Sequence, residues 1–290
     1  MAIWNLGSIN ADMVYTMPHL PTAGETLAAT ALDQFLGGKG ANTSVAAARA
    51  GSLAHHIGAV GPDGKWAVDR LTEYGVDTRH IAQIDVPTGH AIIAVDQQGE
   101  NQIILYSGAN QKIDQNSLKQ ALTEANAGDI LVMQNETNLQ VDAARMARGL
   151  GLNVCYAAAP FDEVAVQAVL PYLDFLILNQ VEAAQLERST GKTPDALGVS
   201  DVIMTLGARG ARHIDGNTGV IHDIPALPVT AVDTTGAGDT FTGYVLSGLD
   251  RGLPMVNAMA QANRAAALMV TRHGTADVIP DLKDVLDARF

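Results

Sequence analysis

The sequence predicts an α/β fold of three layers, in which helices cover both faces of a mainly parallel central sheet and a small β-sheet lid lies beside it. Two observations predict this class. Short apolar segments, most of them flanked by Gly, Asn or Asp, alternate along the chain with amphipathic helical patterns that often end in Gly. Two further segments interrupt this alternation with patterns that favour β-structure, and these form the predicted lid.

The apolar segments have the length of buried strands and supply the predicted core sheet. They lie at 2–9, 54–60, 129–134, 153–159, 174–179 and 201–207. The first follows no basic region and soon meets Asp12, so it is interpreted as a strand rather than a signal peptide. The helical patterns lie at 41–51, 65–75, 115–128, 139–151 and 181–191. Because strand–helix–strand repetition requires crossover connections, the sheet is predicted to be mainly parallel.

Residues 12–36 and 80–108 are the two segments that interrupt the alternation. The first holds a β-like stretch and a Pro/Gly turn, and the second is typical of a hairpin with its turn at Asp96–Glu100. A further hairpin is predicted to turn at Asp215–Gly216. Since no repeat, linker or low-complexity tract divides the chain, residues 1–290 are predicted to form a single domain that carries this lid.

Charge and composition limit the expected partners. The 290-residue chain has a formal net charge of −13 and no run of Lys or Arg, so neither nucleic acid nor an anionic membrane is expected. No apolar run approaches the ~18 residues of a membrane span. The only cysteine, Cys155, excludes an internal disulfide and suits a cytoplasmic location. A polyphosphate ligand would need local positive potential from backbone N–H groups, Mg²⁺ and a few basic side chains.

The stretch DTTGAGDTFTG at 233–243 predicts an anion site. An amphipathic helix is expected from Thr240 to Leu249, so Gly236, Ala237 and Gly238 would lie at its N-terminus with free N–H groups. Phosphate is the usual anion in such a place. A carboxylate there, Asp239, would be repelled by phosphate unless it takes a proton from the group that attacks the phosphate.

Two further motifs suit a ligand beside this anion site. In GGKGAN at 37–42, Lys39 could reach an anion and Asn42 offers a donor and an acceptor, although a plain strand–helix turn with a solvated lysine fits equally. The motif is not a P-loop, because Gly40 follows the lysine where Ser or Thr is required. In SINAD at 8–12, Asn10 and Asp12 would share one side of a strand and suit polyhydroxyl recognition; an Asx turn is the alternative.

Two motifs follow later predicted strands. Asn179 and Glu182 in NQVE would share a helix face, where the carboxylate suits Mg²⁺ and the spacing also fits an N-cap with a capping-box glutamate. TLGARGA at 205–211 could cradle phosphates or a ribose, or only turn into the next hairpin. The histidines at 55, 56, 80 and 90 lack convincing metal-ligand spacing and are interpreted as surface or packing residues.

Taken together, the order and spacing of these motifs resemble the ribokinase (PfkB-type) family of carbohydrate kinases, nearly from end to end. GGKGAN and DTTGAGDTFTG look like the two signatures of that family, and SINAD, YSGAN, NQVE, TLGARG and NRAAALMVTRHG follow in its order. The resemblance implies the ribokinase-like three-layer α/β/α fold with a β-sheet lid.

The resemblance also implies a role for each matching residue. The positions that match sugar ligands are Asn10, Asp12, Gly38, Lys39, Asn42 and Glu136. Asp239 matches the catalytic base, and Gly236, Ala237 and Gly238 match the anion hole. The nucleotide-side positions are Asn179, Thr205, Gly207, Gly210 and Asn263. Glu182 matches a glutamate linked to Mg²⁺ through water, and a monovalent cation is implied at Asp233, Thr235, Arg272 and Gly274.

Three positions depart from the family pattern. Ala157 stands where ribokinases tend to have Asn, and the stretch between Glu187 and Asp201 is short, as if a helix had been trimmed. Val278 replaces a serine that helps to complete the cation site, so the dependence on K⁺ is open.

We therefore expect an ATP-dependent sugar kinase that phosphorylates a primary hydroxyl, with O5 of ribose as the first choice and ribose 5-phosphate as the product. ATP and Mg²⁺ are the expected cofactors, K⁺ is a candidate activator, and a homodimer through the lid is the expected assembly. The alternatives are fructose, adenosine or another nucleoside, or a keto-deoxy sugar acid, for which no extra Arg stands out near the lid. A dinucleotide-dependent oxidoreductase would need G-x-G-x-x-G in its first βα turn. A non-catalytic sugar-binding regulator would not need Asp239.

Overall fold

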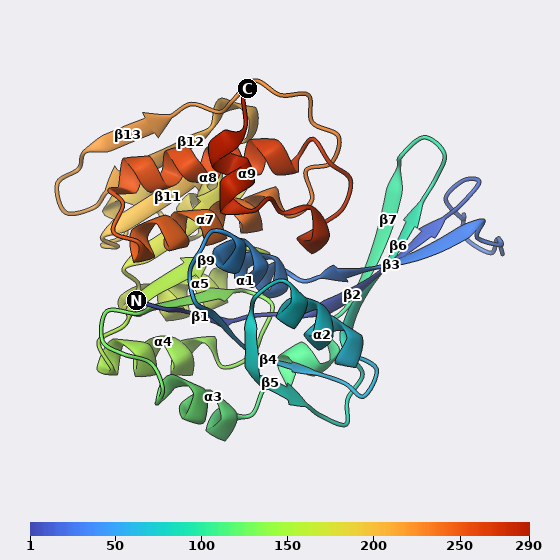
Figure 1. The fold of residues 1–290 in the computed structure, drawn as a ribbon, viewed down its shortest axis with the longest axis horizontal. Coiled ribbons are helices and arrows are strands. Elements are labelled where there is room, and N and C mark those ends of the chain that lie inside the picture. Colours follow the sequence, from blue (N-terminus) through green and yellow to red (C-terminus); the bar gives the residue numbers. More distant parts are fainter.

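The computed structural model describes residues 1–290 and contains two β-sheets (Figure 1). The larger sheet has nine strands in the order β13-β12-β11-β10-β9-β8-β1-β4-β5. In chain order its strands are β1 (Ile3–Leu6), β4 (Ala54–Val60), β5 (Asp77–Gln83), β8 (Ile130–Gln134), β9 (Asn153–Ala157), β10 (Phe175–Asn179), β11 (Asp201–Thr205), β12 (Ala211–Asp215) and β13 (Ile221–Ile224). The strands from β11 to β5 are parallel to one another, and only β12 and β13 pair antiparallel, so the predicted mainly parallel sheet is confirmed.

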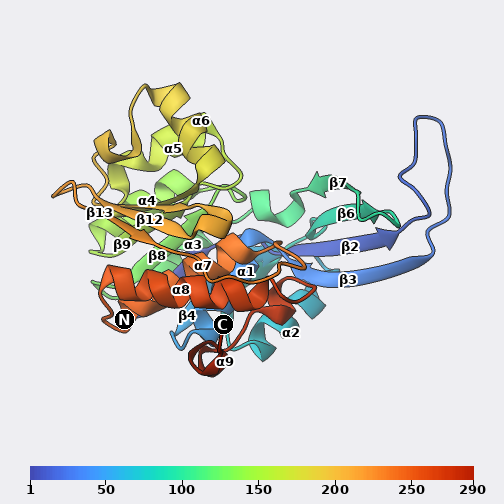
Figure 2. The same ribbon diagram turned by 90° about the horizontal axis from the view of Figure 1, so that it is seen from above.

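Helices cover both faces of this sheet, as the edge-on view shows (Figure 2). One face carries α1 (Lys39–Arg49), α2 (Lys65–Glu73), α7 (Ala237–Asp250), α8 (Met255–Met269) and α9 (Leu282–Asp287). The other face carries α3 (Gln115–Leu122), α4 (Gln140–Gly149), α5 (Glu163–Val169) and α6 (Gln180–Thr190). Each helical layer shares an apolar core with the sheet, which is the three-layer arrangement that the alternating pattern predicts. None of these helices combines the length and the apolar composition that crossing a bilayer requires.

Some elements differ from the sequence predictions. Helices α5, α8 and α9 and the edge strand β5 are not among the predicted elements. Buried residues of α8 include Met259, Ala262, Ala265 and Met269, whereas Asn257, Gln261 and Arg264 follow one another at helical spacing and are not buried. Helix α7 begins at Ala237 rather than at Thr240, because Gly236 adopts a left-handed φ of 75° and caps the helix three residues earlier than expected.

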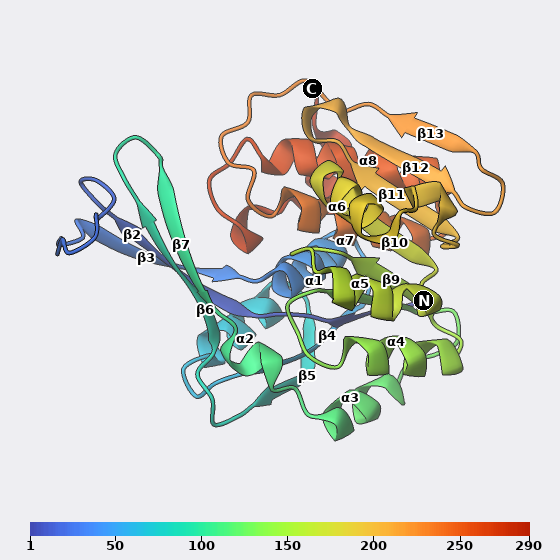
Figure 3. The ribbon, with the colours of Figure 1, turned by 180° about the vertical axis from the view of Figure 1, so that it is seen from behind.

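The second sheet has the order β3-β2-β6-β7 and projects away from the main body (Figures 1 and 3). Its strands are β2 (Asn10–Thr16), β3 (Ala31–Gly37), β6 (Gly89–Val95) and β7 (Asn101–Tyr106). Two antiparallel hairpins, β2–β3 and β6–β7, are joined by the parallel pair β2–β6. The segments predicted at 12–36 and 80–108 thus supply this sheet, but residues 77–83 form β5 at the edge of the larger sheet instead.

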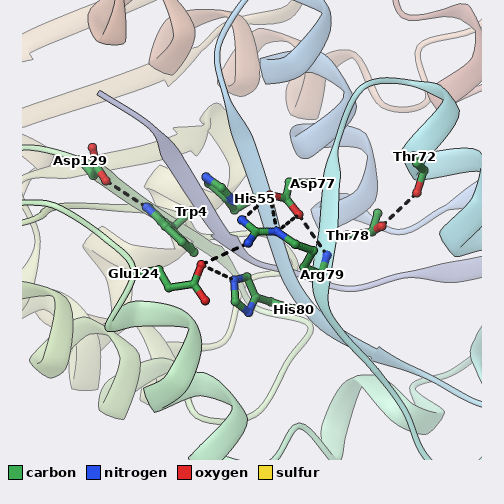
Figure 4. Close-up of polar contacts among 9 residues, drawn as sticks. All are labelled: Trp4, His55, Thr72, Asp77, Thr78, Arg79, His80, Glu124 and Asp129. Atoms are coloured by element: carbon green, nitrogen blue, oxygen red, sulfur yellow. Dashed lines mark hydrogen bonds and ion pairs between the residues drawn. The ribbon is translucent and has the colours of Figure 1, made fainter.

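The edge of the larger sheet at β1, β4 and β5 is tied together by polar contacts around a buried tryptophan (Figure 4). The indole of Trp4 donates to Asp129 over 3.1 Å and stacks on the ring of His55, with 4.0 Å between the centroids. His80 of β5 lies 3.5 Å from the carboxylate of Glu124. His55 and His80 therefore have packing roles in this edge, as the sequence analysis expects.

Helices α1 and α7 pack in close contact, with only small side chains between their backbones. A Cβ atom on Gly243 of α7 would lie 2.5 Å from the Cβ of Ala46 and 2.7 Å from the carbonyl oxygen of Thr43, both in α1. Nearer the N-terminus of α1, a Cβ on Gly40 would collide with Gly7 and Ser8, just after β1. The small residues of α1 thus let the helix fit between the end of β1 and α7.

We predict that Gly243→Ala lowers the free energy of unfolding. The new methyl group overlaps backbone and side-chain atoms of α1, and overpacking of this kind typically costs about 1–3 kcal/mol. Gly149→Ala is the matched control. Gly149 is also a helical residue, the last of α4, but a Cβ there would lie in open space. Urea denaturation should show a loss for Gly243→Ala and no loss for Gly149→Ala; equal effects would contradict the close crossing.

Candidate active site

The predicted site residues gather at the carboxyl ends of the parallel strands. Strand β1 lies between β4 and β8, where the order of the strands reverses along the chain, and ligands of open α/β sheets bind at such a place. The segments that follow β1, β8, β10 and β11 contain Ser8–Asn10, Glu136, Glu182 and Gly207–Gly210 respectively. The small sheet starts from the same edge, because β2 continues from β1 after three residues.

The N-terminus of α7 presents free backbone donors. Gly236 caps the helix, and no side chain bonds to the amides of the first turn. The amides of Gly236, Gly238 and Asp239 have no protein acceptor, whereas that of Ala237 donates to the carbonyl oxygen of Thr234 over 3.2 Å. Of the three residues predicted to form the anion hole, Gly236 and Gly238 thus offer free donors, and the amide of Ala237 is partly used by the turn.

Asp239 lies in the first turn of α7 and is held by a residue of α1. The side-chain amide of Asn42 donates to Oδ2 of Asp239 over 2.9 Å. Burial raises the pKa of Asp239, while the nearby charge of Lys39 and the hydrogen bond from Asn42 oppose that shift. A carboxylate with a raised pKa, next to free backbone donors, has the properties of a general base beside an anion site.

Lys39 is the basic side chain at the centre of this region. Its ammonium lies near the carboxylates of Asp239, Glu136 and Glu182, and the attraction of Asp239 is the main reason why the pKa of Lys39 is raised. The backbone N–H of Lys39 donates to Oε2 of Glu136 over 3.1 Å, and the hydroxyl of Ser8 donates to the same oxygen. Lys39 therefore joins the anion site of α7 to the carboxylates near the end of β1.

Asn10 and Asp12 lie on β2, the first strand of the small sheet, which is separated from the core strand β1 by residues 7–9. They are two residues apart, so their side chains share one face. Burial and the charge of Glu136 raise the pKa of Asp12 to about 7. Gly37 and Gly38 lie against these residues: a Cβ on Gly37 would collide with the carboxylate of Asp12, and Gly38 has a φ of 95°.

The polar groups on this side of the site have unused bonding capacity. Oδ1 of Asn42 is buried and has no hydrogen-bond partner within the protein. The carboxylate of Asp12 accepts no hydrogen bond from the chain. Since buried polar groups are normally paired, these groups suit a ligand with several hydroxyl groups.

A pocket of about 310 Å³ opens beside the N-terminus of α7. Its walls come from the Gly207–Arg209 turn, the loop before α7, and helices α7 and α8, and ten of the 16 lining residues are hydrophobic. The predicted nucleotide-side residues that line it are Thr205, Gly207, Gly210 and Asn263. A mainly apolar pocket that ends at a row of free N–H donors can hold a flat ring system joined to a phosphate chain.

Two of the predicted nucleotide-side residues also have structural roles. The side-chain amide of Asn263 donates to the carbonyl oxygens of Ile224 and Pro225, both over 3.1 Å, and so holds the loop after β13. Gly210 has a φ of 101°, and a Cβ there would collide with Ile224. Asn179 does not line the pocket; its side chain caps α6 by accepting from the amides of Val181 and Glu182.

Glu182 completes a capping box with Asn179, since its Oε2 accepts from the backbone N–H of Asn179 over 2.7 Å. Burial raises the pKa of Glu182, which also lies within the electrostatic reach of Lys39 and Asp239. The second carboxylate oxygen has no partner in the chain. A hard oxygen donor within electrostatic reach of the anion site fits Mg²⁺ held through water.

Two of the residues implied for a monovalent cation, Asp233 and Thr235, directly precede the anion hole in the chain. Asp233 accepts from the backbone N–H groups of Thr235 and Gly274, over 2.9 and 3.4 Å. The side chain of Arg272 is exposed and donates to the carbonyl oxygen of Val278 over 3.4 Å. Backbone carbonyls and one carboxylate are thus present here, and the side chain of Val278 supplies no oxygen.

The other two departures from the family pattern are also visible. Ala157 ends β9 and pairs with Gln134 of β8 and Ile177 of β10. The short stretch after α6 contains only the single 3₁₀ turn Pro194–Ala196 before β11 begins.

Two residues that contact the site were not predicted. Ser8 donates to Glu136, and Asn110 donates to Asn10 from a distance of 100 residues along the chain. Asn110 belongs to the YSGAN stretch, but the local pattern there indicates only the end of a hairpin.

Comparison with known proteins agrees with this geometry. Residues 3–282 match the family described as pfkB family carbohydrate kinase. The chain is 35% identical over 297 residues to the ribokinase of Haemophilus influenzae, with 97% of this chain and 96% of the relative covered. Ribokinase from Thermotoga maritima has a similar structure with a TM-score of 0.88 at 29% identity, covering 99% of this chain and 98% of that one. Arabidopsis thaliana ribokinase complexed with ribose and ATP has a TM-score of 0.86 at 28% identity, with the same coverage. This chain belongs to the PfkB family of carbohydrate kinases.

Proposed function

We propose that this protein is an ATP-dependent kinase that transfers the γ-phosphoryl group to O5 of ribose and forms ribose 5-phosphate. The observation that carries the proposal is the contact between Asn42 and Asp239 beside the free N–H donors of α7. The chain covers more than nine tenths of the curated ribokinase from Haemophilus influenzae, and the related Arabidopsis structure holds ribose and ATP.

In this mechanism Asp239 takes the proton of the attacking hydroxyl. Asn42 fixes one carboxylate oxygen of Asp239, so that the other can face the substrate. The amides of Gly236, Ala237 and Gly238 stabilise the charge that builds on the transferred phosphoryl group, and those of Gly236 and Gly238 have no competing acceptor. Glu182 would hold Mg²⁺ through water, and the metal would supply positive charge that offsets the charge of the phosphates.

The two substrates take opposite sides of Lys39 in this proposal. The sugar is bound by Asn10, Asp12, Gly38, Lys39, Asn42 and Glu136. The nucleotide occupies the 310 Å³ pocket, with Thr205, Gly207, Gly210 and Asn263 against it and Asn179 acting through the cap of α6. We also propose that the small sheet is a lid on a single kinase domain, and that it closes over the sugar and keeps out water that would compete as acceptor.

We further propose that the chain is a homodimer through this lid. Strand β7 is an edge strand whose side chains are exposed throughout, and Ile103, Ile104 and Leu105 are each more than half exposed. An apolar edge of this kind favours pairing with a second chain. Sedimentation of the purified protein tests this, since a monomer at all concentrations would contradict it.

The single buried Cys155 supports a cytoplasmic location.

A coupled assay with ATP and a panel of ribose, fructose, adenosine and a keto-deoxy sugar acid tests the proposal directly. We predict phosphorylation of ribose, and a loss of turnover of about 10²–10⁴-fold in Asp239→Asn, because Asn fills the same space but cannot take the proton. Asp284→Asn is the matched control, since Asp284 is also an acidic residue in the first turn of a helix, α9, but is remote from the site. Turnover of Asp239→Asn within a few-fold of wild type would contradict the base assignment.

A second prediction concerns Asp12. The ionised carboxylate can accept from two sugar hydroxyls, so sugar affinity should increase as the pH rises through about 7, where Asp12 loses its proton in the free protein. In Asp12→Asn the sugar should bind more weakly and this pH dependence should disappear, while binding of an ATP analogue should change little. Calorimetry with each ligand between about pH 6 and about pH 8.5 separates the effects. An equal loss for both ligands would reject the sugar-side role of Asp12.

A third prediction concerns the monovalent cation. Asp233 and nearby carbonyl groups can coordinate K⁺ although Val278 supplies no ligand, so we expect activation by K⁺ at a higher concentration than a site with a serine there would need. Initial rates are measured against K⁺ at constant ionic strength, with tetramethylammonium as the balancing ion. Val278→Ser should lower the K⁺ concentration needed. A flat response in both proteins would remove the cation from the mechanism.

A further inference from the structure

Asn110 is a buried residue to which no role in the reaction has yet been given. It lies in the short 3₁₀ turn Gly108–Gln111, directly after β7, and only 2% of it is exposed. Its Oδ1 accepts from the backbone N–H of Ile9 over 2.9 Å. Its Nδ2 donates to the carbonyl oxygen of Ile9 over 3.2 Å and to Oδ1 of Asn10 over 2.8 Å. Both ends of this amide are therefore occupied by the segment that leads into β2.

The two bonds to Ile9 fix which way the amide of Asn110 points. If the amide were reversed, its NH₂ group would face the N–H of Ile9 and its oxygen would face the carbonyl oxygen of Ile9, so both bonds would be lost. The remaining hydrogen of Nδ2 then points at Asn10, which must present its oxygen to it. The NH₂ group of Asn10 is left facing the other way and has no acceptor in the protein.

We propose that Asn110 is a positioning residue that fixes Asn10 as a hydrogen-bond donor toward the sugar. Asn10 would then recognise a lone pair on a sugar oxygen, whereas ionised Asp12, on the same face of β2, can only accept. One side of the acceptor sugar is thus read by a donor and the neighbouring position by an acceptor. This inference rests on the proposed sugar kinase function and adds the polarity of one sugar contact to it.

The side-chain amide of Asn110 lies where the strands of the small sheet meet the main body. Strand β2 begins at Asn10, strand β6 begins at Gly89, and Asn110 follows the end of β7. A Cβ on Gly89 would collide with Nδ2 of Asn110 and lie 2.5 Å from Oδ1 of Asn10, so the three residues are in direct contact. The orientation of Asn10 is therefore set at the point where the small sheet joins the main body.

The substitution Asn110→Asp tests the proposal with little change in shape. One carboxylate oxygen can still accept from Ile9, but the other no longer donates to Asn10, so the amide of Asn10 is free to turn and present its oxygen to the sugar. We expect KM for ribose to rise about tenfold, which corresponds to about 1.4 kcal/mol, while KM for ATP changes less than about twofold. Fluorine can accept a hydrogen bond but cannot donate one, so wild-type protein should bind a deoxyfluoro analogue of ribose more tightly than the matching deoxy sugar. In Asn110→Asp this difference in affinity should disappear.

Asn138 supplies the matched control. Its Oδ1 accepts from the N–H of Ile113 over 3.1 Å and its Nδ2 donates to the carbonyl oxygen of Ile113 over 2.9 Å, so it clamps a backbone in the same way without touching Asn10. Asn138→Asp should leave KM for ribose near the wild-type value. An equal rise in both variants would assign the effect to loss of a structural clamp and overturn the proposal.

A double-mutant cycle shows whether Asn110 acts through Asn10. In an Asn10→Ala background, Asn110→Asp should have no further effect on KM for ribose; additive effects would overturn the proposal. If Asn110→Asp does not fold, Asn10→Asp tests the same polarity, because its second oxygen would face the sugar as an acceptor, and unchanged affinity there would also overturn it. Failure of the proposed function would be seen separately, as wild-type protein that phosphorylates no sugar.

Discussion

The close crossing of α1 and α7 is the constraint on which the rest of the site depends. Because Gly243 has no side chain, the two helices approach until the backbone of one touches small side chains of the other. This contact brings the N-terminus of α1, with Lys39 and Asn42, to the N-terminus of α7, with Asp239. The free amides of α7 and the ammonium group of Lys39 thus lie close together, and they supply the local positive potential that an otherwise acidic protein needs if it is to bind a polyphosphate.

Carboxylates outnumber ammonium groups around Lys39, and this excess of acidic groups suits a nucleotide that carries Mg²⁺. Lys39 is the ammonium to which Asp239, Glu136 and Glu182 are coupled, and burial raises the pKa of each of these carboxylates. Such a cluster of carboxylates repels a bare triphosphate, and the free amides of α7 offset that repulsion only in part. A nucleotide that arrives with a bound Mg²⁺ removes much of the conflict, because the metal neutralises the phosphates.

The small sheet contributes residues as well as cover. Asn10 and Asp12 lie on β2, so the groups proposed to bind the sugar belong to the element proposed to close over it. Asn110 ties β2 to the end of β7, and Gly89 packs against both asparagines at the start of β6. A sugar that bonds to Asn10 would therefore act directly on the junction of the two sheets, which gives a physical route from sugar binding to closure.

The sequence by itself determined the features that depend on neighbouring residues. The alternating pattern predicted the three-layer fold, and glycine-rich turns marked the helix N-termini. The spacing of Asn179 and Glu182 predicted a capping box that the structure contains. It could not determine that Asn10 joins the second sheet together with Asp12, or that Asn179 lies away from the pocket. The contacts of Asn42 with Asp239 and of Asn110 with Asn10 join residues 197 and 100 positions apart. Backbone conformation is set by residues within a few positions, whereas such pairs are selected only when whole helices and sheets pack, so only the tertiary structure decided them.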